Sequence, residues 1–147
     1  MKTYLKIIII AILIGGLIAF LFYRDIKNEV NALTNKDNTI NLFQVGVYKI
    51  YDNALNCKNN YDNAILYEDN GLYRVIIAAA SSNDAKIRLE TFFTNQNIKY
   101  YIKEIKVNKD ITNKIKNYEI VLMKTNNDDV INNINKSILD TLITVLS

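Results

Sequence analysis

The chain of 147 residues contains no histidine, no proline and no tryptophan, and its only cysteine is Cys57. A single cysteine cannot form an internal disulfide, and without a group of cysteines and histidines there is neither a thiol–imidazole pair nor a zinc site. The acidic residues of the central region fall mostly in expected turns and on helix surfaces, which argues against a hydrolytic pair of carboxylates. We therefore expect a protein that is not an enzyme and that needs no metal and no cofactor.

The chain also has little net charge outside its N-terminal segment. Its formal charge is +3. Residues 1–23 contain Lys2, Lys6 and no acidic residue, which leaves 16 basic against 15 acidic side chains, or +1, for the remainder. Binding to the phosphate backbone of a nucleic acid requires a basic surface. We expect no nucleic-acid partner.

Residues 7–23 form a hydrophobic run without a charged side chain. As a helix this run would reach about 25 Å, near the lower limit for crossing a bilayer. A cleaved signal peptide is the alternative, but the end of the run lacks a small-x-small cleavage site. Because Lys2 and Lys6 precede the run, the N-terminus is expected in the cytoplasm and the rest of the chain outside the membrane. We predict a single-pass membrane anchor at residues 1–23, followed by a juxtamembrane linker at 24–40.

The most apolar stretch after this run is at residues 72–80, which directly follow Asn70-Gly71 and predict a buried central strand. The Asn-Gly step favours a tight hairpin turn with a short strand at 64–68. A further strand is predicted at 42–49, where alternation places two sets of side chains on opposite faces. The set expected in the core is Phe43, Val45 and Val47, and the set expected on the other face is Gln44, Gly46 and Tyr48.

Two helices and a last strand complete this region. Asp52 or Asn53 can cap a short helix, and residues 84–95 carry an apolar stripe at helical spacing. Residues 100–107 predict an edge strand. The order is βαββαβ, so the fold class is α+β, a ferredoxin-like or RNP-like domain at 41–108. Its four-stranded antiparallel sheet would carry helices on one face and leave the other open.

Residues 109–147 predict two amphipathic helices separated by Thr125-Asn126-Asn127. Each has an apolar stripe, and charged residues in both argue against a membrane span. A helical hairpin folded onto the domain is favoured over an arm that binds a partner, because large exposed apolar stripes are uncommon on monomers.

Residues 42–107 resemble the SPOR domain, a peptidoglycan-binding module of bacterial division and sporulation proteins. The first half carries Gln44-Val45-Gly46-x-Tyr48 and then Asn53-Ala54 at a helix start; the second carries Leu-Tyr-Arg-Val-x-Ile at 72–77 and then Asn83-Asp84-Ala85. Two positions where the family has glycine are Ala78 and Asn97 in this chain.

The resemblance implies a helix-free sheet face that binds peptidoglycan glycan strands, preferentially strands stripped of their stem peptides. It also implies that Gln44, at the position of a recurrent glutamine, contributes to binding. Strand alternation adds neighbours on the same face. The candidate glycan-binding residues are Gln44, Gly46, Tyr48, Leu72, Arg74 and Ile76.

The sequence leaves three functional hypotheses. The first is a membrane-anchored extracytoplasmic module that binds peptidoglycan at division or sporulation sites. The second hypothesis keeps the same fold but assigns the protein a structural or interaction role in a cell-envelope complex. In that role its C-terminal helices would bind an envelope protein partner, and it would not bind glycan. The third, RNA binding by an RNP-like sheet, is disfavoured by the near-neutral domain.

Overall fold

A computed structural model of the chain describes residues 38–146. The predicted anchor at 1–23 and residues 24–37 of the predicted linker lie outside these residues. Within residues 38–146, no helix is both long enough and apolar enough to cross a membrane.

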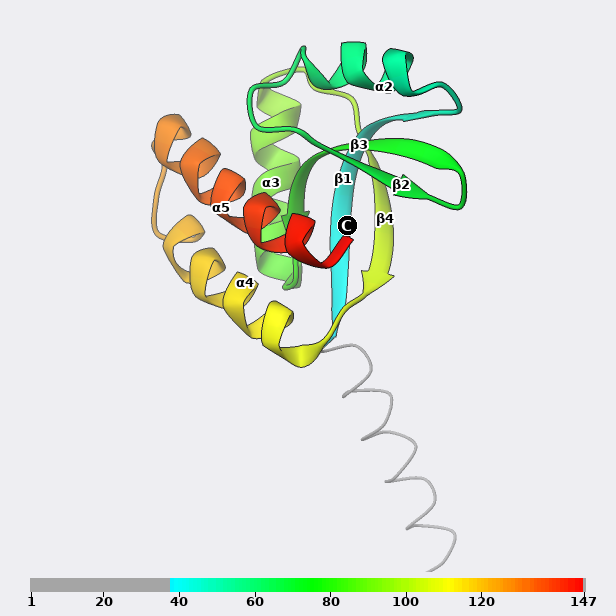
Figure 1. Cartoon of the computed structure of the whole chain (residues 1–147). Helices are drawn as coiled ribbons and strands as arrows, with labels where there is room; N and C mark the ends of the chain where they lie inside the picture. Colours follow the sequence, from blue (N-terminus) through cyan, green and yellow to red (C-terminus); the bar gives the residue numbers. More distant parts are fainter. Residues whose placement is uncertain (1–37, 147) are drawn as a thin grey trace, which may run out of the picture. The chain divides into compact units, whose positions relative to one another are not determined.

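Four strands form one antiparallel sheet in the order β2-β3-β1-β4 (Figure 1). The strands are β1 Thr39–Tyr48, β2 Ile65–Asp69, β3 Leu72–Ala80 and β4 Tyr101–Lys106. Strand β3 lies in the interior of the sheet and β4 at an edge, both as predicted. The predicted α+β class with a four-stranded antiparallel sheet is therefore confirmed, although β1 begins three residues before the predicted strand.

Two helices follow the first and third strands, α2 Tyr51–Lys58 and α3 Asn83–Asn95. Helix α3 is capped by Ser82, whose side chain accepts a hydrogen bond from the Ala85 N–H at 3.2 Å. Helix α2 starts at Tyr51, and the residue before it makes no side-chain cap. The prediction that Asp52 or Asn53 caps this helix was wrong; Asp52 lies within its first turn, where a carboxylate favours the positive end of the helix dipole.

Two asparagines adopt the left-handed conformation that usually favours glycine. Asn70 and Gly71 have φ values of 53° and 72°, as a type I′ hairpin turn requires, so the predicted turn is confirmed. Asn97, with φ 56°, ends α3 in a Schellman motif: Ile98 N–H donates to Phe93 O and Asn97 N–H to Thr94 O, both at 3.0 Å. Asparagine tolerates this conformation better than other side chains, so Asn97 can stand where the SPOR pattern has glycine.

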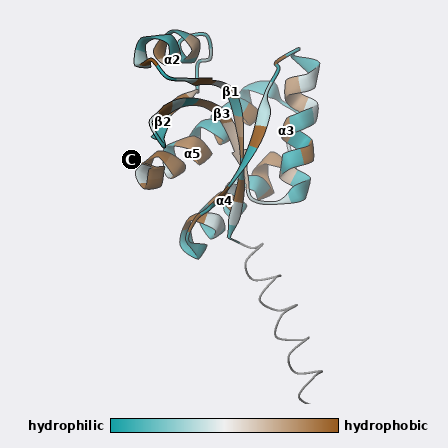
Figure 2. Cartoon of the chain, turned by 90° about the vertical axis from the view of Figure 1, so that its right-hand side faces the viewer, coloured by the Kyte–Doolittle hydropathy of each residue, from teal (hydrophilic) through white to brown (hydrophobic). Residues whose placement is uncertain are grey.

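The C-terminal segment folds into two helices, α4 Lys109–Leu122 and α5 Asp128–Leu146, which pack against each other. Helix α5 packs on β3 and β2, and Figure 2 shows α5 and α3 on opposite sides of the sheet. The predicted helical hairpin folded onto the domain is confirmed. The prediction that helices leave one sheet face open was wrong, because this hairpin covers part of that face.

Candidate functional site

Two β-bulges change which side chains share a face of the sheet. Between β1 and β3, Phe43 lies opposite Ala78 and Gln44 opposite Ile76, so Ile77 has no residue opposite it. Gly46 then lies opposite Val75, which leaves Val45 without an opposite residue. An extra residue in one strand shifts the alternation of every residue beyond it. The face assignment predicted for β1 therefore fails after Gln44.

Gly46 and Tyr48, predicted beside Gln44, lie on the other side of the sheet. Tyr48 is opposite Tyr73, whose ring contacts that of Tyr51 of α2 at 5.4 Å between centroids. A side-chain hydrogen bond with Cys57, also in α2, raises the pKa of Tyr48. The prediction that Gly46 and Tyr48 share a face with Gln44 was wrong.

Val47, rather than Gly46 or Tyr48, lies on the same face of the sheet as Gln44. It was predicted in the core, yet it lies opposite Arg74 and is 41% exposed. Phe43, by contrast, is buried as predicted, and its ring contacts those of Phe93 and Tyr100.

Ile76 lies on the face of Gln44 but is fully buried. Leu42 and Ile65, which share that face, are buried as well. The prediction that Ile76 is available on an open face was therefore wrong, because α4 and α5 leave only one half of the face exposed. We call that half the exposed sheet face; its half-buried or exposed residues are Gln44, Val47, Tyr67, Asp69, Leu72, Arg74, Tyr101 and Lys103.

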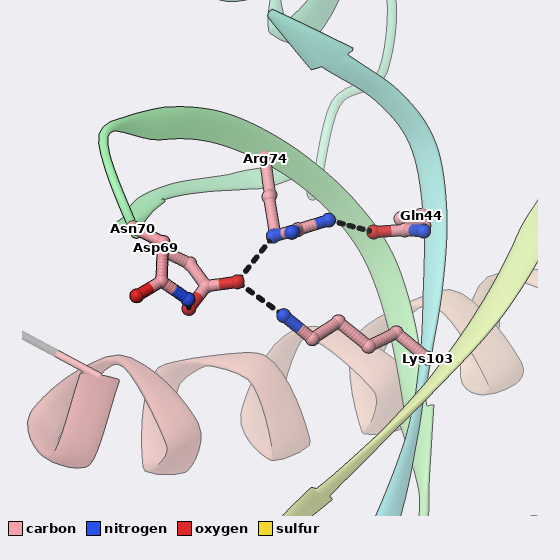
Figure 3. A network of polar contacts seen from close by, with 5 residues as sticks. All are labelled: Gln44, Asp69, Asn70, Arg74 and Lys103. Atoms are coloured by element: carbon pink, nitrogen blue, oxygen red, sulfur yellow. Dashed lines mark hydrogen bonds and ion pairs between the residues drawn. The ribbon is translucent and has the colours of Figure 1, made fainter.

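A network of polar side chains crosses the exposed sheet face (Figure 3). Arg74 donates from Nε to Asp69 Oδ2 at 2.7 Å and from Nη1 to Gln44 Oε1 at 3.2 Å. Lys103 Nζ forms an ion pair with the same Asp69 oxygen. The sheet thus brings Gln44 and Arg74 into direct contact, and Asp69 links two cations that come from β3 and β4.

The Asp69 carboxylate is stabilised in its charged form. The hydrogen bond from Lys103 is the main cause that lowers its pKa below the ordinary 3.8, and the hydrogen bond from Arg74 lowers it further against the opposing effect of burial. The side chains of Arg74 and Asp69 are 15% and 21% exposed. This partial burial holds the guanidinium in one place.

The arrangement can bind a polar ligand. Among the described residues, Asp69 and Gln44 engage two of the five N–H donors of a guanidinium. Tyr101, opposite Gln44, is 72% exposed and offers a flat apolar surface with a polar tip. Donors beside apolar surface are what recognition of a polar molecule requires.

Sequence reasoning identified Gln44, Leu72 and Arg74 but missed Lys103 and Asp69. The facing of the last strand could not be read from Tyr100, Tyr101 and Ile102, which are apolar in succession. Strand β4 begins at Tyr101. Tyr101 and Lys103, two residues apart, therefore both lie on the face of the sheet that carries Gln44. Asp69 was expected in the hairpin turn, but in the structure it is the last residue of β2.

Comparison with known proteins finds one similar solved structure. No family model and no curated protein matches the chain. The solution structure of the peptidoglycan binding domain of the B. subtilis cell wall lytic enzyme CwlC matches 46% of this chain and 90% of its own length, at 25% sequence identity. The TM-score is 0.39.

Proposed function

We propose that this chain binds peptidoglycan glycan strands through its exposed sheet face. On this proposal the protein is a SPOR-like module, anchored by residues 7–23 and exposed outside the membrane at division or sporulation sites. It prefers glycan strands that have lost their stem peptides.

The observation that carries the proposal is the contact between Gln44 and Arg74. The SPOR-like pattern singles out Gln44, and the fold places its Oε1 3.2 Å from Arg74 Nη1 on the part of the sheet that helices do not cover. An amide and a guanidinium together offer donors and an acceptor to sugar hydroxyl and N-acetyl groups. The exposed Tyr101 ring lies opposite Gln44 and can pack against the apolar face of a sugar.

The test is co-sedimentation of the full chain with purified sacculi that an amidase has stripped of stem peptides. The wild-type protein should sediment with them. Gln44→Ala should weaken binding by about twofold to tenfold for every neutral hydrogen bond lost, and Arg74→Ala, which removes a charged donor, by about tenfold or more. The matched control is Arg88→Ala, because Arg88 also donates a hydrogen bond, to Thr125 O at 2.7 Å, but belongs to α3.

Two results would contradict the proposal. Failure of the wild-type protein to sediment would refute glycan binding itself. Equal sedimentation of wild type and folded Gln44→Ala and Arg74→Ala variants would refute the exposed sheet face as the site. The membrane topology is tested separately: protease added to wall-stripped cells should degrade residues 38–146, and an intact domain beside a degraded external marker would overturn the extracytoplasmic placement.

A second candidate function is an interaction subunit of an envelope complex. The observation that favours it is a group of apolar side chains at the C-terminal end of α4 and directly after it that are between 38% and 55% exposed: Tyr118, Ile120, Val121 and Met123. If this surface holds a protein partner, Ile120→Asp with Val121→Asp should dissociate a complex purified from membranes. Sedimentation with sacculi should then fail for the wild type.

A further inference from the structure

A hollow lies away from the exposed sheet face, where the loop after α2, the end of α3 and the first turns of α5 meet. It has a volume of about 230 Å³. Five carboxamide residues line it together with Tyr61, Asp62 and an apolar group; the carboxamides are Asn60, Asn63, Gln96, Asn132 and Asn135, and the apolar residues are Ala64, Ile77, Phe93 and Ile98. Of the described residues that line it, none is lysine or arginine.

One of the lining side chains has an unmet hydrogen-bond acceptor. Asn135 is 5% exposed, and its Nδ2 donates to the backbone carbonyl of Ile77 at the β3 bulge. Its Oδ1 is buried and accepts no hydrogen bond from any residue between 38 and 146. Leaving a buried acceptor unsatisfied costs free energy, which a donor admitted to the hollow by a small rotation of the Asn135 side chain would relieve.

A neighbouring contact fixes one wall of the hollow. Asn63 Nδ2 donates to the backbone carbonyl of Asn132 at 3.3 Å, which ties the loop after α2 to α5. Phe93 packs against Phe43 and Phe92 and is held as part of the core. The polar walls and the apolar floor are therefore positioned without a ligand.

We infer that this hollow, which we call the carboxamide pocket, binds a single neutral sugar ring. A volume of about 230 Å³ lies below the roughly 300–1,000 Å³ of pockets that hold drug-sized ligands, the scale of one ring rather than a chain. Carboxamides donate and accept at once, as sugar hydroxyls do. The absence of lysine and arginine from the described lining, and the presence of Asp62, disfavour an anion.

The pocket is distinct from the exposed sheet face, and the two should select different sugars. The exposed sheet face carries Arg74 and Lys103 and tolerates an anionic group, whereas the pocket carries only Asp62 as a charged side chain among its described residues. The pocket is therefore expected to prefer N-acetylglucosamine over N-acetylmuramic acid, whose lactyl group bears a carboxylate.

The test is a ligand-observed saturation-transfer NMR titration of the full chain, held in a detergent without a sugar headgroup. N-acetylglucosamine should bind saturably, and N-acetylmuramic acid more weakly. Asn132→Leu should weaken N-acetylglucosamine binding by about fivefold or more. Asn133→Leu, the exposed neighbour outside the pocket, should change it less than twofold. Gln96→Leu at the end of α3 is the second pocket variant should Asn132→Leu fail to fold.

Absence of saturable N-acetylglucosamine binding would overturn the inference, and so would equal binding by a folded pocket variant. Asn132→Leu and Arg74→Ala separate the two sites, because the first should weaken N-acetylglucosamine binding and the second should weaken sedimentation with sacculi. Loss of monosaccharide binding in Arg74→Ala with retention in Asn132→Leu would refute the pocket but leave the glycan-binding proposal standing. N-acetylglucosamine binding that Asn132→Leu weakens, together with failure of the wild-type protein to sediment with sacculi, would refute the glycan-binding proposal but leave the pocket standing.

Discussion

At the scale of single residues, Asp69 determines how the exposed sheet face is held. It ends β2 at one edge of the sheet, and its carboxylate is bound by Arg74 from the next strand and by Lys103 from the opposite edge strand. Neither the Arg74–Asp69 nor the Lys103–Asp69 ion pair is fully exposed. Solvent and salt therefore screen these two ion pairs less than a typical surface ion pair.

The first prediction concerns the pH dependence of this group. Because the folded-state pKa of Asp69 is lowered, the ionised carboxylate stabilises the fold above its ordinary pKa of 3.8, and this contribution is lost as the pH falls through the lower folded value. Asp69→Asn should therefore be less stable than wild type at pH 7, and the difference in unfolding free energy should shrink below pH 3.8. Urea unfolding of both proteins at pH 7 and below pH 3.8 measures this difference in unfolding free energy. A difference that does not change with pH would contradict a stabilising role for the ionised Asp69 carboxylate.

Some of these residue contacts could be predicted and some could not. Gln44 and Arg74 were placed together because both fall before the bulges in their own strands. Gly46 and Tyr48 were misplaced because strict alternation was assumed through Gln44-Val45-Gly46-Val47-Tyr48, although a glycine inside a strand is itself a sign of a bulge. A bulge depends on how two strands pair, which is a tertiary property that alternation within one strand does not contain.

At the scale of elements, the helical hairpin is positioned by a buried carboxylate. Glu119 of α4 is 4% exposed and accepts hydrogen bonds from the backbone N–H groups of Ser81 and Ser82 and, at 3.0 Å, from Ser81 Oγ. These donors lie at the start of α3, where a negative charge also favours the helix dipole. One side chain thus fixes α4 against the β3–α3 junction.

The second prediction tests this contact. Glu119→Ala should destabilise the fold by about 1–3 kcal/mol, because half-buried donors of Ser81 and Ser82 lose their acceptor. Asn117→Ala, an exposed position on the same helix, should change stability by no more than about 0.5 kcal/mol. Chemical denaturation of the full chain compares the two, and equal stabilities would show that Glu119 does not fix the hairpin.

The sequence predicted that the last two helices fold back but not where they pack. Apolar stripes in α4 and α5 show that each must be covered, which is why the hairpin could be predicted. The surface that covers them is a sheet face whose apolar half, with Leu42 and Ile76, becomes evident only once the strands are paired. The face expected to be wholly open is consequently divided into a buried half and an exposed half.

At the scale of the whole molecule, the hairpin and the sheet share one continuous core. Ile115, Leu139 and Leu142 of the hairpin are fully buried, as are Leu42 and Ile76 of the sheet. We therefore expect residues 38–146 to unfold as one cooperative unit rather than as a domain with a separable tail.

The third prediction follows from this shared core. A chain that ends at Asn108 should lose cooperative unfolding or be much less stable than the full chain, because Leu42 and Ile76 become exposed to water. Leu139→Ala is the milder test and should cost about 2–5 kcal/mol. Val145→Ala, 40% exposed on the same helix, should cost far less. A truncated chain with the unfolding midpoint of the full chain would contradict the shared core.

The position of β1 in the sheet has a mechanical consequence. β1 is bonded to β3 on one side and to β4 on the other, and the chain enters it at Thr39 directly from the preceding residues. Suppose that the N-terminal end of β1 is pulled while β3 or β4 is held. The force then runs along β1 and loads its two rows of hydrogen bonds in shear. Bonds loaded in this way must break together rather than one after another, so the domain is built to resist traction from its N-terminal end, and its lifetime under load would be set by the rate of unfolding.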